Sequence, residues 1–251
     1  TEAWDAATLA ANEPSLCDGL AGGIFFPGDA SLRPDRFVTE LARLAREAGC
    51  ELIEDCGVRG FVRERGRIVG VDTTQGPQRG RDVLIATGAW SPALVSQLDF
   101  ALPIQPGKGY SITWDAQRAP PRRPLVLKER SVCVTAWGSG FRLGSTMEFS
   151  GYDTTLNRTR LDALERGAAG YLREPPAGVR REEWYGWRPM TFDDLPVIGR
   201  APGSDNLWLA TGHGMMGVSM SMATGHLVAD LMYGRDPILD PAPYSALRFQ
   251  Q

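Results

Sequence analysis

Residues that build metal sites and disulfide frameworks are scarce in this chain. Its 251 residues include two histidines and four cysteines, and no two cysteines have the CxxC spacing. Zinc sites and disulfide frameworks need closely spaced groups of these residues, so we expect neither. The cysteines, Cys17, Cys50, Cys56 and Cys133, are instead expected to be free, buried thiols.

The chain also lacks long hydrophobic runs and a strong excess of charge of one sign. No apolar stretch approaches the roughly 20 residues that a membrane-spanning helix needs, and no basic-then-apolar signal segment opens the chain. The formal net charge of −3 argues against a nucleic-acid-binding protein, because such proteins normally present a basic face. We therefore expect a globular protein that binds no nucleic acid and has no integral membrane segment.

Two common catalytic signatures are missing as well. The chain has no GKS or GKT phosphate-binding sequence, and no Ser-His-Asp or Cys-His constellation stands out. His213 lies in a glycine-rich loop, where a histidine is more often structural than a catalytic base. We therefore name no catalytic acid, base or nucleophile.

The first hundred residues have the pattern of an α/β fold. An apolar stripe behind Pro34 predicts a helix that ends at Gly49. Short strands are predicted at residues 20–27, 50–53, 58–64, 68–73 and 83–86. The last of these strands is apolar without alternation, which predicts that both of its faces are covered.

The remaining residues predict a second kind of architecture. Residues 100–150 alternate between apolar and polar positions around glycine turns, which is typical of an antiparallel sheet. A helix is predicted over residues 156–173 and a strand over residues 206–210. A final helix over residues 218–233 ends at Gly234. We expect the methionines at its start, Met215, Met216, Met220 and Met222, to pack in the core.

The loop at residues 212–217 spells GxGxxG between a predicted strand and a predicted helix. A dinucleotide-binding unit needs a second parallel strand after the helix, but prolines follow here at positions 237, 241 and 243, so we reject that interpretation. The loop still suits a flat or anionic ligand, because helix N-termini carry unpaired N–H groups and glycines allow close approach. A flavin pyrimidine fits this description; a glycine-rich helix entry without a ligand is the alternative.

Three side chains are candidates for binding a substrate. Arg188 lies in the aromatic segment WYGWRPM, where its guanidinium either grips a carboxylate through two hydrogen bonds or pairs with Asp193 or Asp194. Arg142 lies on an alternating strand and is either a ligand contact or part of a solvated strand face. Tyr110 is either a hydroxyl donor to a ligand or a packed core residue.

Several segments together resemble the D-amino acid oxidase-like family of FAD-dependent oxidoreductases. These segments are residues 85–92 (IATGAWSP), 186–199 (GWRPMTFDDLPVIG), 206–217 (NLWLATGHGMMG) and 23–34, which ends in FPGDASLRP. The resemblance covers essentially the whole chain. The WRPMT, TGHG and KGYS sequences resemble most closely the D-amino acid dehydrogenases, with glycine oxidase and sarcosine oxidase as near relatives.

The resemblance implies a mixed α/β fold. The C-terminal part of a flavin-binding, Rossmann-like domain would be interleaved with an antiparallel-sheet substrate domain. The FAD-binding domain would comprise residues 31–99 and 189–251, and the substrate-binding domain residues 1–30 and 100–188. It also implies a location in the cytoplasm, or peripheral to the inner membrane of a bacterium.

FAD is the cofactor that the resemblance implies. Val58 would lie near the adenine, residues 86–88 near the diphosphate, and the loop that begins at Gly212 over the flavin pyrimidine. The full set of expected FAD contacts is Val58, Ala86, Thr87, Gly88, Trp90, Gly212, His213, Gly214, Met215, Met216, Gly217, Val218 and Ser219.

The implied activity is oxidative deamination of an amino acid, and the nearest resemblance favours the D configuration. Arg188 would bind the substrate carboxylate, with Arg142 and Tyr110 as helpers, and a hydride would pass from the substrate α carbon to flavin N5. Binding geometry, more than a protein base, would supply most of the catalysis. The alternative within enzymes is a secondary-amine oxidase of the glycine and sarcosine type, acting on sarcosine, proline or an opine-like substrate.

This sequence departs from the family pattern in two places. The family opens with a strand, a GxGxxG turn, a helix and an acidic residue for the ribose, and this chain shows no such segment before residue 20. We therefore expect that this chain lacks part of the FAD site. The alternative to an active enzyme is a cofactor-free, inactive fragment, or a subunit that dimerises or needs a partner carrying that half. Glycine oxidases of the family carry an arginine in the final loop where this chain has Met215 or Met216, which favours a dehydrogenase-like relative.

Overall fold

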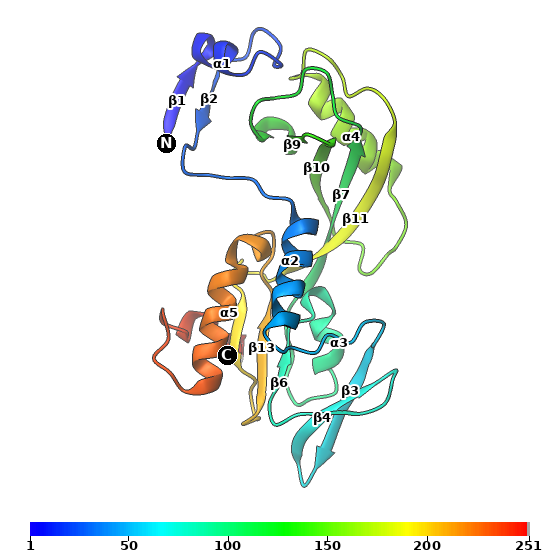
Figure 1. Cartoon of the computed structure of the whole chain (residues 1–251), viewed down its shortest axis with the longest axis vertical. Coiled ribbons are helices and arrows are strands. Elements are labelled where there is room, and N and C mark those ends of the chain that lie inside the picture. Colours follow the sequence, from blue (N-terminus) through cyan, green and yellow to red (C-terminus); the bar gives the residue numbers. More distant parts are fainter. Residues whose placement is uncertain (250–251) are drawn as a thin grey trace. The chain divides into compact units, whose positions relative to one another are not determined.

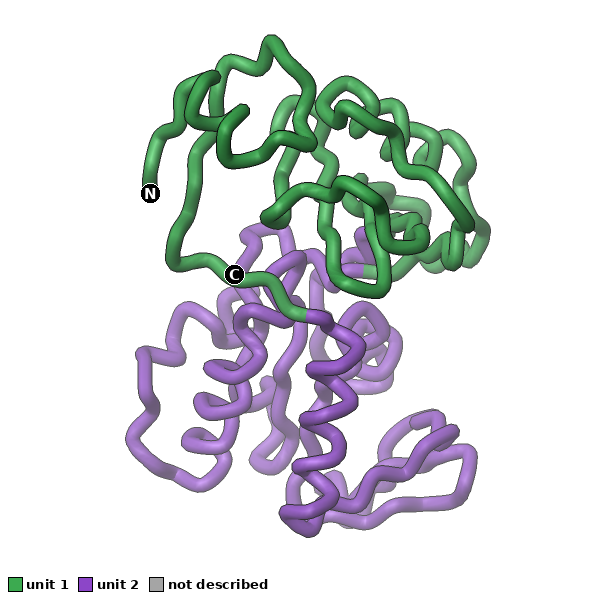
Figure 2. Tube along the Cα trace, turned by 45° about the horizontal axis from the view of Figure 1, so that its top comes forward, with its two compact units in different colours: residues 1–32, 108–187 green, residues 33–107, 188–251 purple. Residues whose placement is uncertain are grey.

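The computed structural model describes residues 1–249 and divides the chain into two compact units. The first unit comprises Thr1–Leu32 and Lys108–Trp187, and the second comprises Arg33–Gly107 and the chain from Arg188 onward (Figure 2). Each unit is thus assembled from two separate stretches of sequence. Relative to the predicted ranges, the middle boundary moves from residue 99 to residue 107, and Arg188 falls in the second unit.

A five-stranded sheet with strand order β11-β7-β10-β9-β8 forms the frame of the first unit (Figure 1). Its strands are β7 (Gln105–Trp114), β8 (Leu125–Leu127), β9 (Val132–Trp137), β10 (Gly140–Glu148) and β11 (Arg180–Met190). The neighbours from β7 to β8 pair antiparallel, as the alternation of residues 100–150 predicts. Strands β8 and β11 were not predicted.

One face of this sheet holds the core of the first unit. Alternation along β7 and β10 sends large apolar side chains to the same face, where helix α4 (Arg158–Ala169) packs over them. The Asn157 side chain accepts a hydrogen bond from the Arg160 N–H and so caps this helix. Buried members of the cluster are Tyr110, Ile112, Trp114, Phe141, Leu143, Leu161, Leu164 and Ala168.

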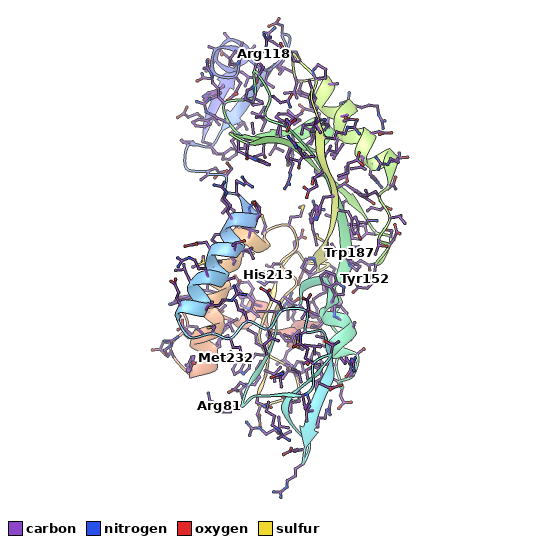
Figure 3. All side chains as sticks on the ribbon, turned by 45° about the vertical axis from the view of Figure 1, so that its right-hand side comes forward. Arg81, Arg118, Tyr152, Trp187, His213 and Met232 are labelled. Atoms are coloured by element: carbon purple, nitrogen blue, oxygen red, sulfur yellow. The ribbon has the colours of Figure 1, made fainter. Side chains whose placement is uncertain are left out.

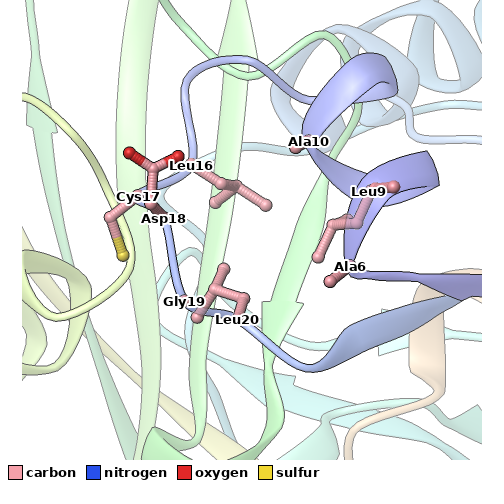
Figure 4. A pocket seen from close by; sticks show the side chains of 9 residues that line it. Ala6, Leu9, Ala10, Leu16, Cys17, Asp18, Gly19 and Leu20 are labelled. Carbon is pink, nitrogen blue, oxygen red and sulfur yellow. The ribbon is translucent and has the colours of Figure 1, made fainter.

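The N-terminal stretch completes the first unit. Strands β1 (Glu2–Asp5) and β2 (Gly22–Phe25) pair antiparallel around helix α1 (Ala6–Asn12), and a 3-10 turn, η2 (Lys128–Arg130), lies between β8 and β9. Helix α1 and residues 16–20 border a cavity of about 490 Å³ (Figure 4). Most of its lining is hydrocarbon, and it includes none of the predicted site residues.

The second unit contains two three-stranded sheets. In one, β13 (Leu207–Thr211) pairs parallel with β6 (Val83–Ile85) and antiparallel with β12 (Val197–Arg200). In the other, β4 (Arg67–Thr73) lies between β3 (Val58–Glu64) and β5 (Gln78–Arg79). The β3–β4 hairpin turns at Arg65 and Gly66, as predicted. Its Ile68 shares a core with Ile85 and Leu209 of the other sheet.

Two longer helices and several short ones complete this unit. They are α2 (Pro34–Glu47), α3 (Ser91–Val95), α5 (Gly217–Tyr233), η1 (Gly88–Trp90), η3 (Ala242–Tyr244) and η4 (Ala246–Phe249). Pro34 starts α2, as the sequence predicts. Gly234 ends α5 with a φ of 64°, in the left-handed region that glycine adopts most easily. No helix among the described residues is long and apolar enough to cross a membrane.

Four expectations about strands and burial are wrong. Residues 50–53 form no strand, because a strand exists only with a hydrogen-bonded partner. Leu84 of β6 is 40% exposed, so β6 is not covered on both faces. The methionines Met215, Met216 and Met222 are exposed. The cysteines are free but not buried: Cys50 and Cys133 are exposed and the other two are half-buried.

Helix α5 offers a matched pair of glycine substitutions. Gly234→Ala should lower the free energy of unfolding by about 1 kcal/mol, because an alanine Cβ is strained in the left-handed conformation. Gly225→Ala should raise it by up to about 1 kcal/mol, because Gly225 lies inside the helix and nothing lies within 4 Å of an added Cβ. Urea unfolding of both variants measures the two effects; changes of the same sign would contradict this assignment.

Candidate functional site

Parallel pairing of β6 with β13 brings two distant turns to one edge of the sheet. The register pairs Val83 with Leu207 and Ile85 with Leu209, so both strands end on the same side. Ligands of open α/β sheets bind outside the carboxyl ends of parallel strands. Residues 86–90 follow β6 and residues 212–219 follow β13. The expected FAD contacts other than Val58 therefore lie on these two adjacent turns.

Glycines give both turns a backbone that other residues would strain. Gly88, Gly212 and Gly214 have φ values of 54°, 74° and 53°, in the left-handed region. A Cβ on Gly212 would also lie 3.0 Å from the Thr191 Cγ2 atom. The turns thus require glycine at these positions whether or not a ligand is bound.

The surface of the two turns suits a flat, electron-rich group. Trp90, Met215, Met216 and Val218 are between 42% and 67% exposed. No side chain caps the start of α5, which is 17 residues long, so its first N–H groups and positive dipole end are available to an anionic edge. These residues fit the pyrimidine side of a flavin. Val58 lies elsewhere in the unit, at the start of β3 and opposite Thr73.

His213 is tied to the helix that follows it (Figure 3). Its Nε2 atom lies 2.9 Å from the Thr224 hydroxyl oxygen. Burial lowers the pKa of His213 below its ordinary value of 6.5, so the ring is neutral at pH 7. This contact gives the side chain a structural role in holding the loop against α5.

The segment after Arg188 is bound directly to the glycine turn. The Gly214 N–H donates to the Pro189 carbonyl oxygen at 3.0 Å, and a Cβ on Gly214 would lie 3.6 Å from the Met190 sulfur. Asp193, one of the acidic partners considered for Arg188, forms a 2.8 Å ion pair with Arg248. That hydrogen bond holds the pKa of Asp193 below its usual range. The hydrogen bond between Gly214 and Pro189 therefore lies one residue from Arg188.

Arg142 and Tyr110, both in the first unit, lie on opposite faces of their sheet. Arg142 donates to the Thr113 hydroxyl and to Glu182, both at 2.8 Å. Tyr110 is 2% exposed on the core face, where its hydroxyl donates to Glu148 at 2.8 Å, and burial raises its pKa. Both side chains therefore have internal partners, and the core-packing interpretation describes the surroundings of Tyr110.

Sequence reasoning missed two buried polar groups. Lys108 is fully buried, 3.0 Å from Asp153 and over the Tyr185 ring, and the Thr155 N–H together with Lys108 lowers the pKa of Asp153 to about 2. The Tyr185 ring meets Trp187 edge-on, as does Tyr152 (Figure 3). A second group joins Ser91 to Thr211 at 2.8 Å. No local pattern signals either group, because each links residues far apart in the sequence.

The α/β fold and the two turns at the carboxyl edge of a parallel strand pair suit a flavin-like ligand. Comparison with known families agrees: residues 1–231 match the model of the DAO family, described as FAD dependent oxidoreductase. The chain belongs to this family, and the predicted cofactor class and mixed α/β fold are confirmed.

Curated relatives carry two different names. The chain is 39% identical over 234 residues to a glycine oxidase of Pseudomonas aeruginosa, covering 92% of this chain and 64% of that protein. It is 38% identical over 261 residues to a D-amino acid dehydrogenase of Cereibacter sphaeroides, covering 99% and 58%. The chain thus spans about 60% of the length of these relatives.

Solved structures show the same fold. A glycine oxidase from Geobacillus kaustophilus superposes with a TM-score of 0.83 at 26% identity, covering 97% of this chain and 66% of that one. L-proline dehydrogenase from P. horikoshii superposes with a TM-score of 0.85 at 23% identity, covering 99% and 68%. The second likeness supports the fold alone.

The lowered pKa of His213 predicts how stability depends on pH. The unfolded chain binds a proton at this histidine more readily than the folded chain does, so its contribution to stability is present above about pH 6.5 and is lost as pH falls. A His213→Gln variant should therefore lose less free energy of unfolding than the parent between pH 7.5 and pH 5.5, measured by urea unfolding. His226→Gln, which retains His213, is the matched control and should keep this contribution. An unchanged pH response in His213→Gln would contradict the assignment.

Proposed function

We propose that this chain supplies the substrate-side part of an FAD-dependent enzyme that deaminates amino acids oxidatively, with D-amino acids as the favoured class. The observation that carries the proposal is the hydrogen bond from the Gly214 N–H to the Pro189 carbonyl oxygen. It joins the residue after Arg188 to the turn that suits a flavin. A carboxylate on Arg188 is thereby kept close to the cofactor loop.

Each part of the site then has a physical task. The Arg188 guanidinium binds the substrate carboxylate through two hydrogen bonds and orients the α carbon. The turn at residues 212–219 and the start of α5 hold the flavin pyrimidine, and residues 86–90 lie toward the rest of FAD. Bound FAD supplies the two-electron acceptor for the oxidation.

A glycine or sarcosine oxidase is the second candidate. It is supported by the name of the Pseudomonas aeruginosa relative, at 39% identity. Against it stand Met215 and Met216, which are exposed in the turn where the resemblance gives glycine oxidases an arginine. Primary D-amino acids should therefore react faster than glycine and sarcosine.

Arg188→Lys tests the proposed carboxylate contact. Lysine keeps the charge but cannot form the bidentate pair, so KM for a D-amino acid should rise about 100-fold, equivalent to about 3 kcal/mol of lost binding. Steady-state oxidation of D-alanine, glycine and sarcosine by the FAD-loaded protein, with an artificial electron acceptor, measures the effect. Arg142→Lys is the matched control and should raise KM much less, because Arg142 belongs to the other unit and its guanidinium donates to Thr113 and Glu182. Equal effects in both variants would contradict the assignment to Arg188, and a preference for sarcosine would favour the second candidate.

We further propose that the second unit is completed by additional polypeptide of the kind that carries the family's GxGxxG segment. Helix α2 has an apolar stripe, yet none of its residues is buried, and Val38 and Leu44 are 60% and 46% exposed. Amphipathic helices normally bury such a stripe. Among the residues that the structure describes, no strand pairs with the outer edge of β6, which can accept another strand.

A charge placed in the α2 stripe tests this surface. Val38→Asp should leave the stability of the chain alone within about 0.5 kcal/mol, because Val38 is exposed. It should weaken association with the separately produced N-terminal part of the Pseudomonas aeruginosa relative at least tenfold, because an aspartate would be buried there without a partner. Titration calorimetry measures the affinity, and Thr39→Asp, outside the stripe, is the control. Equal affinities of both variants would contradict the proposed surface.

A further inference from the structure

Three hydroxyl groups link the two turns of the candidate cofactor site. Thr87 Oγ1 lies 3.1 Å from Ser91 Oγ, which lies 2.8 Å from Thr211 Oγ1. Thr211 Oγ1 in turn donates to the Gly88 carbonyl oxygen at 3.0 Å. We propose that these hydroxyls, here called the hydroxyl bridge, are a positioning element that sets the separation of the two turns for FAD. The cofactor part of this inference rests on the proposed function.

The proton order along the hydroxyl bridge is fixed by its last acceptor. A carbonyl oxygen can only accept, so the single proton of Thr211 is committed to Gly88. Ser91 must then donate to Thr211, and Thr87 must donate to Ser91. Ser91 is 0% and Thr211 is 1% exposed, so water cannot readily replace a missing member. Each hydroxyl of the bridge therefore donates in the same direction, from Thr87 to the Gly88 carbonyl oxygen. Both ends of the bridge lie in the turn after β6.

The hydroxyl bridge fixes the orientation of the backbone through the Gly88 carbonyl group. It accepts the Thr211 hydroxyl and also the Ser91 N–H, so both of its lone pairs are used. The peptide bond is planar, and fixing this oxygen fixes the orientation of the whole peptide group after Gly88. Gly88 has a φ of 54°, so this peptide is held in a conformation that favours glycine.

The position of Thr211 connects the bridge to the centre of the sheet. The parallel ladder between β6 and β13 ends at Ile85 and Leu209. Thr211, two residues further, is still paired with Val197 of β12. Beyond the end of the ladder, the Thr211 hydroxyl connects β13 to the turn after β6 through its hydrogen bonds with Ser91 and Gly88. Its loss should free residues 86–91 and 212–217 together and leave the strands paired.

Thr211→Val and Thr211→Ser form a matched pair for testing the bridge. Valine keeps the shape and removes the hydroxyl, whereas serine keeps the hydroxyl. Amide hydrogen exchange of the flavin-free protein should become about tenfold faster at residues 86–91 and 212–217 in Thr211→Val and stay near the parent rate in Thr211→Ser. The dissociation constant for FAD, from flavin fluorescence titration, should rise about tenfold in the valine variant alone.

Ser96→Ala is the control, because it removes a hydroxyl that is bonded only to the nearby Ala93 carbonyl, and it should change neither measurement. Unchanged amide hydrogen exchange in both turns of Thr211→Val would contradict the claim that the hydroxyl bridge joins them. Faster exchange across the whole second unit, or faster exchange in the turns with unchanged FAD affinity, would overturn its positioning role. Failure of the parent protein to bind FAD would count against the proposed function instead, while the exchange measurement would still decide whether the bridge joins the two turns.

Discussion

The parallel pairing of β6 with β13 is the constraint on which the candidate site depends. These two short strands are separated by more than a hundred residues in the sequence, yet their register places both carboxyl ends at one edge. Everything expected to contact the flavin ring follows from that edge: the turn after β6, the turn after β13 and the start of α5. The Arg188 segment joins the same place through Gly214 and Pro189. A site of this kind needs no local catalytic motif, because bound FAD would supply the chemistry and the separate backbone segments would position it.

The two units contribute differently to the proposed activity. The second unit holds the turns, Arg188 and the unpaired surfaces of α2 and β6. The first unit has a core beneath α4, and three of its polar side chains have internal partners: Lys108 pairs with Asp153, Tyr110 with Glu148 and Arg142 with Glu182. Such internal pairing suits a rigid sheet. Tyr110 lies in the core because alternation along β7 directs its side chain to the same face as Ile112 and Trp114.

Local signals in the sequence predict much of the fold. Pro34 and Gly234 mark the correct ends of two helices, and the Arg65-Gly66 turn with flanking alternation predicts the hairpin of the second unit. The strand predicted at residues 50–53 is absent because strand formation depends on a partner that local sequence does not reveal. The prediction that the methionines near the start of α5 pack in the core is wrong for a related reason. A glycine loop that faces a ligand or another chain segment has the same composition as one that faces the core.

The candidate site is less predictable than the fold. The glycine turn and Arg188 could be singled out from residue type and from the family resemblance. The links that organise them could not, because Ser91 and Thr211 are 120 residues apart, and no periodicity connects them. The opposite facing of Arg142 and Tyr110 likewise follows from the β7–β10 register, which composition does not determine.

The most direct test of this account is a visible absorption spectrum of the purified protein after incubation with FAD and removal of free cofactor. We predict a retained flavin band, for the chain itself or for its complex with the N-terminal part of a family relative, that is bleached by a D-amino acid. A colourless protein in both preparations would contradict the claim that the turns at residues 86–90 and 212–219 hold FAD.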